Sequence, residues 1–270
     1  MRRYLFVGQD FLVPAAPGAG PFVGGEGPFD LDGRALLRRC YDDLSGELTQ
    51  AYLLDEESAS LALGLKGEGE LRRLNLREAL GLYDAATMKV ALRGIALLRA
   101  LEASRFCGFC GGRMRDNGPE GLDGNGRVCV SCGKLHFPRI SPAVIVLIRK
   151  GPRALVAHNA RFPKGRFGLI AGFVEAGESL EEAVKREARE ETGIEIRDLR
   201  YVMSQSWPFP DSLMMAFTAD WASGEARPDG EEIEELRWCL PSELPDIPPK
   251  GSVARILFDE FVVSQENGSV

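Results

Sequence analysis

The chain has 270 residues, of which 44% are hydrophobic, so it is long enough to bury the cores of one or two domains. Its formal net charge of −7 argues against non-specific nucleic-acid binding through a broad basic surface, although it does not exclude one local basic groove. The sequence contains no run of about 18 apolar residues, and its short N-terminal apolar stretch does not suit a signal peptide, so we expect no membrane span and a cytoplasmic protein.

Residues 1–104 are predicted to form a small α/β domain. The apolar runs 5–7 and 11–13, separated by turn-forming residues, predict a hairpin. Residues 84–102 carry Ala, Leu and Met at helical spacing, which predicts a helix. This part of the chain shows no catalytic motif. Arg77 alone is considered as a substrate contact, and a plain surface arginine is the favoured interpretation.

Four of the six cysteines form two Cys-x-x-Cys pairs with eighteen residues between them: Cys107, Cys110, Cys129 and Cys132. In a cytosolic chain this spacing is typical of a zinc site and not of disulfides, and the glycine after each pair suits a tight knuckle turn. Four thiolates complete the zinc tetrahedron and leave no position for a reactive water, so we predict a structural Zn²⁺ in a ribbon over residues 105–138. The middle of the ribbon, residues 117–126, is too rich in glycine to pack without the metal.

Residues 139–270 are predicted to form the catalytic domain. Apolar runs typical of strands occur at 143–148, 155–157, 169–174, 199–203, 213–217 and 236–240. Residues 253–262 are predicted to form an amphipathic helix with Ser252 as its N-cap. Strands with a few interspersed helices favour an α+β fold in which a mixed sheet is sandwiched between helices.

The most informative segment is residues 172–194, which contain a predicted helix over 179–192. Ser179 and Glu182 have the spacing of a capping box at the start of this helix, and Gly193 lies where a left-handed C-terminal cap is expected. On a helical wheel the apolar residues form one stripe that should pack on the body of the protein: Leu180, Ala183, Val184 and Ala188.

Charged residues interrupt this apolar stripe. Glu187 and Glu191 fall inside it, and Glu190 and Arg186 lie on its flank. A Glu-rich helix is usually a solvated surface, and that interpretation accounts for the outward charges but not for the inward ones. A carboxylate turned towards a core costs several kcal/mol unless it is paired or binds a metal, and neighbouring carboxylates repel each other unless a cation lies between them. The pattern therefore predicts a divalent-metal site.

The same segment resembles the Nudix box of nucleoside-diphosphate hydrolases. Gly172, Glu178 and the run 186–194, Arg-Glu-Ala-Arg-Glu-Glu-Thr-Gly-Ile, fill every fixed position of that long pattern. The resemblance implies the Nudix fold and hydrolysis of a nucleoside diphosphate linked to another group. The expected catalytic residues all lie in this box: Glu178, Arg186, Glu187, Glu190 and Glu191.

The inward glutamates are the first expected metal ligands. Glu187 and Glu191 lie one turn apart, and Mg²⁺ or Mn²⁺ suits an all-oxygen site. Glu190 is expected to be a third ligand or the base that positions water. The resemblance adds the carbonyl of Ala171 as a further ligand.

Three more residues are expected to support this metal site. Glu232 matches a family metal ligand, with its neighbour Glu231 as the competing choice. Arg186 is expected to orient the carboxylates, and Glu178 to bridge to Arg186 or to help the metals.

Residues 204–212, Ser-Gln-Ser-Trp-Pro-Phe-Pro-Asp-Ser, resemble the motif of the NADH pyrophosphatase subfamily of Nudix hydrolases. Two prolines stiffen this expected loop and hold Trp207 and Phe209 as flat surfaces that suit stacking on a purine or nicotinamide ring. An aromatic-proline corner that serves only the core is the alternative. Substrate contacts are expected from Phe137, Gln205, Trp207, Pro208, Phe209, Pro210, Ser212 and Ala254.

The zinc ribbon and the segments 136–142 and 248–254 resemble the same subfamily. The resemblance covers residues 105 to about 265 well. The resemblance implies cleavage of NAD(H) to nicotinamide mononucleotide and AMP, removal of an NAD cap from RNA 5′ ends, and a homodimer. Ser206 stands where the subfamily usually has proline, and Phe137 where some relatives have a substrate-contacting tyrosine. Both departures concern substrate preference more than the reaction.

Two other functions stay open at this point. A Nudix hydrolase of ADP-ribose or of a dinucleoside polyphosphate would use residues 204–212 to recognise a different base. A non-catalytic nucleotide-sensing module, with the ribbon contacting nucleic acid, would have no need for buried metal carboxylates, and the acidic balance of the chain also weighs against it.

Overall fold

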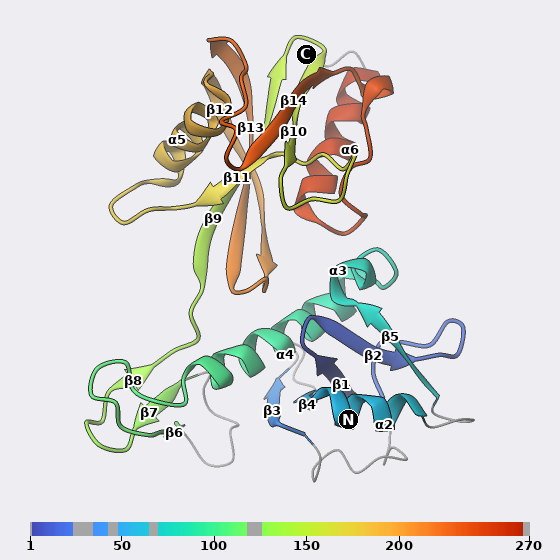
Figure 1. The fold of residues 1–270 in the computed structure, drawn as a ribbon, viewed down its shortest axis with the longest axis vertical. Coiled ribbons are helices and arrows are strands. Elements are labelled where there is room, and N and C mark those ends of the chain that lie inside the picture. Colours follow the sequence, from blue (N-terminus) through green and yellow to red (C-terminus); the bar gives the residue numbers. More distant parts are fainter. Residues whose placement is uncertain (1, 24–34, 43–47, 65–69, 118–125, 267–270) are drawn as a thin grey trace. The chain divides into compact units, whose positions relative to one another are not determined.

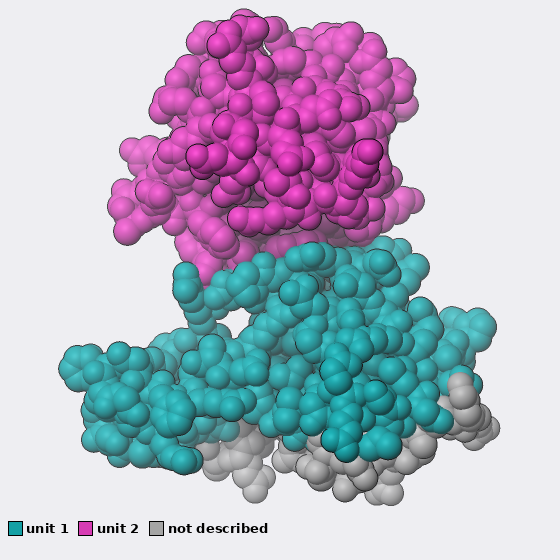
Figure 2. Space-filling model, in the orientation of Figure 1, with its two compact units in different colours: residues 1–139, 208–211 teal, residues 140–207, 212–270 magenta. Residues whose placement is uncertain are grey.

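The structure is a computed structural model that describes residues 2–23, 35–42, 48–64, 70–117 and 126–266. The chain divides into two compact units, coloured separately in Figure 2: residues 1–139 with 208–211, and residues 140–207 with 212–270. The boundaries of three domains at residues 104 and 138 stay a prediction. Most of the glycine-rich middle of the ribbon, residues 118–125, lies outside the described residues.

The first unit contains a five-stranded sheet with the strand order β3-β4-β1-β2-β5. Its strands are β1 (Arg2–Val7), β2 (Asp10–Pro14), β3 (Leu37–Asp42), β4 (Leu48–Leu53) and β5 (Leu71–Asn75). The predicted hairpin is confirmed, because β1 and β2 pair antiparallel with Leu5 opposite Leu12. Phe6 and Phe11 are fully buried and stack with their ring centroids 4.7 Å apart.

Among the described residues, three helices accompany this sheet: α2 (Glu56–Gly64), α3 (Leu76–Ala79) and α4 (Ala85–Ala103). Helix α4 confirms the helix predicted at 84–102 and packs against β3 and β4. Asp84 caps its start by accepting a hydrogen bond from the backbone N–H of Thr87. No helix in the described ranges is both long and apolar enough to cross a membrane.

The ribbon of the first unit is a three-stranded sheet in the order β6-β7-β8. Its strands are β6 (Met114–Asp116), β7 (Arg127–Cys129) and β8 (Leu135–His136). All of its pairs are antiparallel, and the strands are very short. The apolar core under them consists of Cys107, Met114 and Cys129, which is too small to hold the ribbon together by burial alone.

The second unit contains a mixed sheet in the order β12-β13-β9-β10-β14, with β11 paired to β9 (Figure 1). Its strands are β9 (Ser141–Lys150), β10 (Arg153–Asn159), β11 (Ile170–Phe173), β12 (Glu195–Trp207), β13 (Ser212–Ser223) and β14 (Ile233–Cys239). Only the β13–β9 pair is parallel among the pairs described for this sheet. The helical elements are α5 (Leu180–Thr192), the short 3₁₀ helix η2 (Pro241–Glu243) and α6 (Val253–Glu266).

The two long helices cover opposite faces of this sheet (Figure 1). Strand β9 shows why, because its side chains alternate between two cores. Val144, Val146 and Ile148 join the core that contains α5, whereas Ile145 and Leu147 join the core that contains α6. The unbroken apolar run of β9 is therefore that of a strand buried on both faces, and the predicted sheet between helices is confirmed.

Candidate active site

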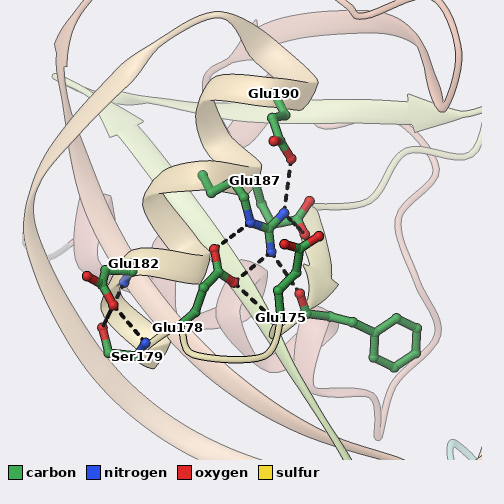
Figure 3. Close-up of polar contacts among 8 residues, drawn as sticks. Glu175, Glu178, Ser179, Glu182, Glu187 and Glu190 are labelled. Carbon is green, nitrogen blue, oxygen red and sulfur yellow. Dashed lines mark hydrogen bonds and ion pairs between the residues drawn. The ribbon is translucent and has the colours of Figure 1, made fainter.

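Helix α5 carries the candidate catalytic residues, and its two ends are fixed by caps. The Ser179 hydroxyl accepts from the Glu182 N–H at 3.3 Å, and the Glu182 carboxylate accepts from the Ser179 N–H at 2.8 Å (Figure 3). This is the predicted capping box. At the other end Gly193 adopts φ 71°, the left-handed conformation that favours glycine. The helix therefore begins and ends where its sequence predicts.

The inward face of α5 is apolar except for two glutamates and the buried Thr192 near its end. Ala183, Val184 and Ala188 are completely buried, and Glu191 on the same face is only 6% exposed. The Glu187 side chain is 12% exposed to solvent. The predicted inward placement of both carboxylates is thus confirmed, and each has lost most of its hydration.

Arg186 donates to three carboxylates on the flank of α5, which Figure 3 labels: Glu178, Glu187 and Glu190. Its Nε and Nη2 donate to the two carboxylate oxygens of Glu178 at 2.6 and 3.0 Å. Its Nη1 donates to Glu187 at 2.8 Å and to Glu190 at 3.0 Å. Its Nη2 also donates to the carbonyl of Phe173 at 2.9 Å, which ties α5 to the end of β11. The expected bridge from Glu178 to Arg186 is present.

The three glutamates that Arg186 contacts have different environments. Hydrogen bonds from Arg186 hold the pKa of Glu178 below its ordinary value. Burial raises the pKa of Glu187 despite the opposing contact with Arg186. The Glu190 side chain is 60% exposed, so it stays in contact with solvent while Arg186 holds it. Glu187 and Glu190 therefore share one guanidinium but differ in their contact with water.

Glu191 is the glutamate of this site in which one carboxylate oxygen, the buried Oε2, lacks a hydrogen-bond partner among the described residues. Burial raises the pKa of Glu191 to about 8, helped by the charges of Glu187, Glu232 and Asp229, while a backbone hydrogen bond from Ala171 acts in the opposite direction. The charges of three neighbouring carboxylates thus act on a side chain whose Oε2 has no described partner. A divalent cation would offset this repulsion and give that oxygen a partner.

Strand β11 comes unusually close to these carboxylates. A Cβ built on Gly172 would lie 1.9 Å from Glu187 Oε1 and 2.0 Å from its Cδ, so no larger residue fits without displacing Glu187. Ala171 precedes it and reaches Glu191 through its backbone. The glycine of the box thus has a steric role, because it lets α5 bring Glu187 against the strand.

Glu232 lies on the turn before β14, and Asp229 shapes that turn. The Asp229 Oδ1 atom accepts from the N–H groups of Glu231 at 3.0 Å, Glu232 at 3.1 Å and Ile233 at 2.8 Å. Of the two competing glutamates, only Glu232 raises the pKa of Glu187 and Glu191 by its charge. Sequence reasoning missed Asp229, although the Asp-Gly pair at 229–230 is a turn signal that precedes the acidic pair.

The four ribbon cysteines converge on one point. Their Sγ atoms all lie within 4.8 Å of one another, with Cys107 and Cys132 3.8 Å apart and Cys110 and Cys129 3.5 Å apart. Thiolates bound at ~2.3 Å to a tetrahedral zinc lie about 3.8 Å apart, so the cluster has the size of a zinc site.

The knuckle turns support thiolate ligands. Gly111 and Gly133 adopt φ 73° and 71°, and their N–H groups donate to the carbonyls of Cys107 and Cys129. Backbone N–H groups within each turn lower the pKa of the Cys107 thiol and bring the pKa of the Cys129 thiol to about 6. Each turn therefore favours the deprotonated form of its first cysteine. A backbone hydrogen bond from Gly112 lowers the pKa of Cys110, but contacts with the neighbouring thiols raise it to about 12, because close sulfurs do not all ionise unless a cation neutralises them.

The predicted substrate segment 204–212 is a β-hairpin and not a loop. Gln205 and Trp207 belong to β12 and Ser212 to β13, because Ser206 pairs with Leu213 and Trp207 with Ser212. The prolines that suggested a loop occupy only its tip, residues 208–211, which belongs to the first unit. Trp207 is thus the last residue of β12, whereas Phe209 lies on the tip between the two strands.

Gln205 is engaged with the chain before α6. Its Nε2 donates to the Gly251 carbonyl at 2.8 Å, and its Oε1 accepts from the Val253 N–H at 2.8 Å. Both polar groups of this side chain are therefore used within the protein. Ala254 follows Val253 in α6. Ser212, at the start of β13, is buried with 6% exposure.

The other predicted substrate residues lie in the first unit. Phe137 is 70% exposed and follows directly on β8. Arg77 stacks on the Phe209 ring with its guanidinium carbon 4.7 Å from the ring centroid, so this arginine is more than a plain surface residue. Arg99 lies 5.7 Å from the same centroid and donates to the Pro208 carbonyl. Pro210, the last of these residues, lies on the tip of the hairpin and is exposed.

Comparison with known proteins gives the family. A NUDIX domain model matches residues 139–261. The curated "NAD-capped RNA hydrolase NudC" of Photobacterium profundum is 45% identical over 186 residues, which are 68% of this chain and 67% of the relative. The protein of the same name from Chromobacterium violaceum is 44% identical over 184 residues, 68% of each chain.

The fold agrees with these matches. A NUDIX hydrolase of known structure from Nitrosomonas europaea is similar with a TM-score of 0.53 and 26% identity, over 61% of this chain and 93% of that one. The box helix, the sheet between two helices and the sequence matches therefore point to one conclusion. The chain belongs to the Nudix hydrolase family and, within it, to the group of curated NAD-capped RNA hydrolases.

Proposed function

We propose that this protein hydrolyses the pyrophosphate bond of NAD(H) to nicotinamide mononucleotide and AMP, and that it removes the NAD cap from RNA 5′ ends. The observation that carries the proposal is the buried, unpartnered Oε2 of Glu191 beside Glu187, which calls for a cation at the end of β11. The names of the relatives from Photobacterium profundum and Chromobacterium violaceum support the substrate.

The cation is proposed to be Mg²⁺ or Mn²⁺, because every candidate ligand atom is an oxygen. The proposed ligands are the carboxylates of Glu187, Glu190, Glu191 and Glu232 and the carbonyl of Ala171. When bound, the metal neutralises charge on the bridging phosphates and lowers the pKa of a bound water.

The remaining box residues act through the chain's own contacts. Glu190, exposed and held by Arg186, is the candidate to accept the proton of the attacking water if it is not a third ligand. Arg186 fixes the orientation of Glu187 and Glu190, and Glu178 fixes Arg186. Glu178 and Arg186 are therefore proposed as positioning residues, with no direct contact to the reacting atoms.

The rest of the proposal concerns binding and assembly. Trp207 and Phe209 are proposed to stack on the bases of the dinucleotide, and the other hairpin residues, Phe137 and Ala254 are proposed as further substrate contacts. One structural Zn²⁺ per chain is proposed for the ribbon cysteines. A homodimer and a cytoplasmic location complete the proposal.

The test is product analysis at equal concentrations of NADH, NAD⁺, ADP-ribose, a diadenosine polyphosphate and an NAD-capped RNA, each with Mg²⁺ or Mn²⁺. We expect nicotinamide mononucleotide and AMP from the dinucleotide and a 5′-monophosphate RNA from the capped RNA. Faster cleavage of ADP-ribose or of the diadenosine substrate would assign the other hydrolase function. Nucleotide binding without metal-dependent hydrolysis would indicate a sensing module.

A further inference from the structure

A seven-residue segment, residues 160–166, joins β10 to the stretch before β11 and lies beside the candidate metal ligands. At its start the Ala160 N–H donates to the Glu232 carbonyl at 3.0 Å. Directly after it the Phe167 N–H donates to the Asp246 carbonyl at 2.8 Å. The segment is thus held between the turn that carries Glu232 and the chain that leads to α6.

Local hydrogen bonds give this segment a defined shape. The Asn159 side chain accepts from the Arg161 N–H at 2.9 Å, and the Asn159 carbonyl accepts from the Phe162 N–H at 2.8 Å. The Arg166 N–H donates to the Pro163 carbonyl at 3.0 Å. A preformed loop of this kind presents its side chains without a large ordering cost on binding.

Two of the three cationic side chains of this loop have no partner among the described residues. Arg161 and Lys164 are exposed, and the side chain of neither makes a hydrogen bond or ion pair within the part of the chain that the structure describes. Arg166, by contrast, is paired with Asp246 at 2.9 Å. Lys250, four residues beyond Asp246, is a third exposed cation without a described partner. Three free positive charges therefore lie on two loops that are hydrogen-bonded to each other.

An aromatic ring stands between two of these cations. Phe162 is 38% exposed, and its ring rests on Gly168, where a Cβ would lie 2.9 Å from Phe162 Cε2. The backbone therefore supports the ring, and the part of its surface that is exposed is available to a ligand. Cations that follow a phosphate backbone, together with a ring on which a base stacks, are typical of single-strand nucleic-acid sites.

We propose that Arg161, Phe162 and Lys164, extended by Lys250, bind the RNA chain that follows the NAD cap, with the cations on its phosphates and a base on the ring. The inference rests on the proposed function, because it assigns the path of that same substrate. A free dinucleotide brings only the two phosphates that the acidic centre handles, whereas each RNA nucleotide brings another. The chain has a net charge of −7, so RNA should bind where positive charges are concentrated, as they are at these three cations.

The path is continuous with the proposed base-binding hairpin. Gln205 of β12 is hydrogen-bonded to Gly251 and Val253, directly after Lys250. The loop at 160–166 reaches the same stretch through Asp246. A polynucleotide whose cap lies at the hairpin and metal centre would therefore meet these cations next.

The experiment compares two substrates on the variant Arg161→Gln/Lys164→Gln. The kcat/KM for an NAD-capped single-stranded RNA is expected to fall about tenfold or more at low salt, and that for NAD⁺ to stay within about twofold. Two lost phosphate contacts should also reduce the slope of log kcat/KM against log salt for the RNA by about 1.4. Adding Lys250→Gln should extend the loss. The matched control is Lys185→Gln/Arg200→Gln, which removes two other exposed cations of the same unit. It should leave kcat/KM unchanged for both substrates.

Binding gives a readout that does not depend on turnover. In the Glu191→Gln background, fluorescence anisotropy should show weaker binding of the capped RNA when Arg161 and Lys164 are also changed. An equal fall for NAD⁺ and capped RNA would overturn the inference, because the cations would then serve the dinucleotide itself. Unchanged RNA binding and an unchanged salt slope would overturn it as well. Failure of the wild-type protein to cleave NAD⁺ would instead contradict the proposed function.

Discussion

Gly172 and Glu187 approach each other so closely that a Cβ on residue 172 would lie 1.9 Å from Glu187 Oε1. We therefore expect Gly172→Ala to push the Glu187 carboxylate away from β11 without unfolding the sheet. Turnover of NAD⁺ should fall by about tenfold to a hundredfold, since a small displacement of a positioned group can cost that much. Steady-state kinetics with Mg²⁺ titration checks this expectation.

The matched control for that change is Gly64→Ala in α2, where a Cβ would meet no atom within 4 Å. It should leave turnover unchanged. Glu187→Gln alone and together with Gly172→Ala should give nearly the same loss, because both changes act on one carboxylate. Fully additive losses would show that Gly172 acts in another way.

Glu191→Gln should lower turnover by two or more orders of magnitude while the protein stays folded. The reason is that this side chain holds the orphaned oxygen, and losing a metal ligand or a positioned acid or base typically costs that much. Kinetics together with a thermal melt separates loss of activity from loss of fold. Wild-type rates in this variant would remove the metal-site hypothesis.

The stability of the protein without added divalent metal should depend on pH through the same residue. Burial raises the pKa of Glu191 from 4.5 to about 8, so the folded state binds a proton that the unfolded state releases. The free energy of unfolding should therefore fall as pH rises from about 4.5 to about 8, by a few kcal/mol at most, since one pKa unit corresponds to about 1.4 kcal/mol.

Added metal should reverse that loss. Mg²⁺ at about 100 times its dissociation constant should restore about 2.7 kcal/mol at pH 8, and it should have much less effect at pH 5, where the carboxylate is protonated. Urea titrations at the two pH values, with and without Mg²⁺, measure both effects. The Glu191→Gln variant is the control and should have a flatter pH profile. A wild-type profile in that variant would assign the dependence to other groups.

Features that depend on neighbouring residues in the sequence could be predicted. The ends of α5 follow from Ser179, Glu182 and Gly193, whose capping contacts span at most a few residues. The convergence of the four cysteines follows from their spacing, because each knuckle turn is local. The inward position of Glu191 follows from helical periodicity alone.

Features that depend on contacts distant in the sequence were missed or misplaced. Gln205 is hydrogen-bonded to residues 251 and 253, and no local pattern around Gln205 indicates those partners. The prolines of the segment 204–212 suggested a loop, but pairing of β12 with β13 extends the strands into it. Asp229 shapes the turn that carries Glu232, and the charges of both residues act on Glu191 of α5, which is distant in the sequence.

Cys129→Ser should remove the ribbon zinc and destabilise the first unit. The part of the ribbon that the structure describes has a core of three residues, and zinc supplies roughly 10–16 kcal/mol in small zinc modules, so burial of these residues cannot replace it. Metal analysis should show loss of one zinc per chain, together with a lower melting temperature. Cys239→Ala, in β14 of the other unit, should keep the zinc. A stable Cys129→Ser protein with its full zinc content would contradict the ribbon assignment.

Gln205→Ala distinguishes a structural role of this side chain from direct substrate binding. The change leaves the Gly251 carbonyl and the Val253 N–H without their partner, so we expect a loss of about 1–3 kcal/mol in the free energy of unfolding. The KM for NAD⁺ should rise as well, because the hairpin is no longer tied to the start of α6. Ser206→Ala, at the exposed neighbouring position, should change neither quantity. A raised KM at unchanged stability would mean that Gln205 leaves its backbone partners to contact the substrate.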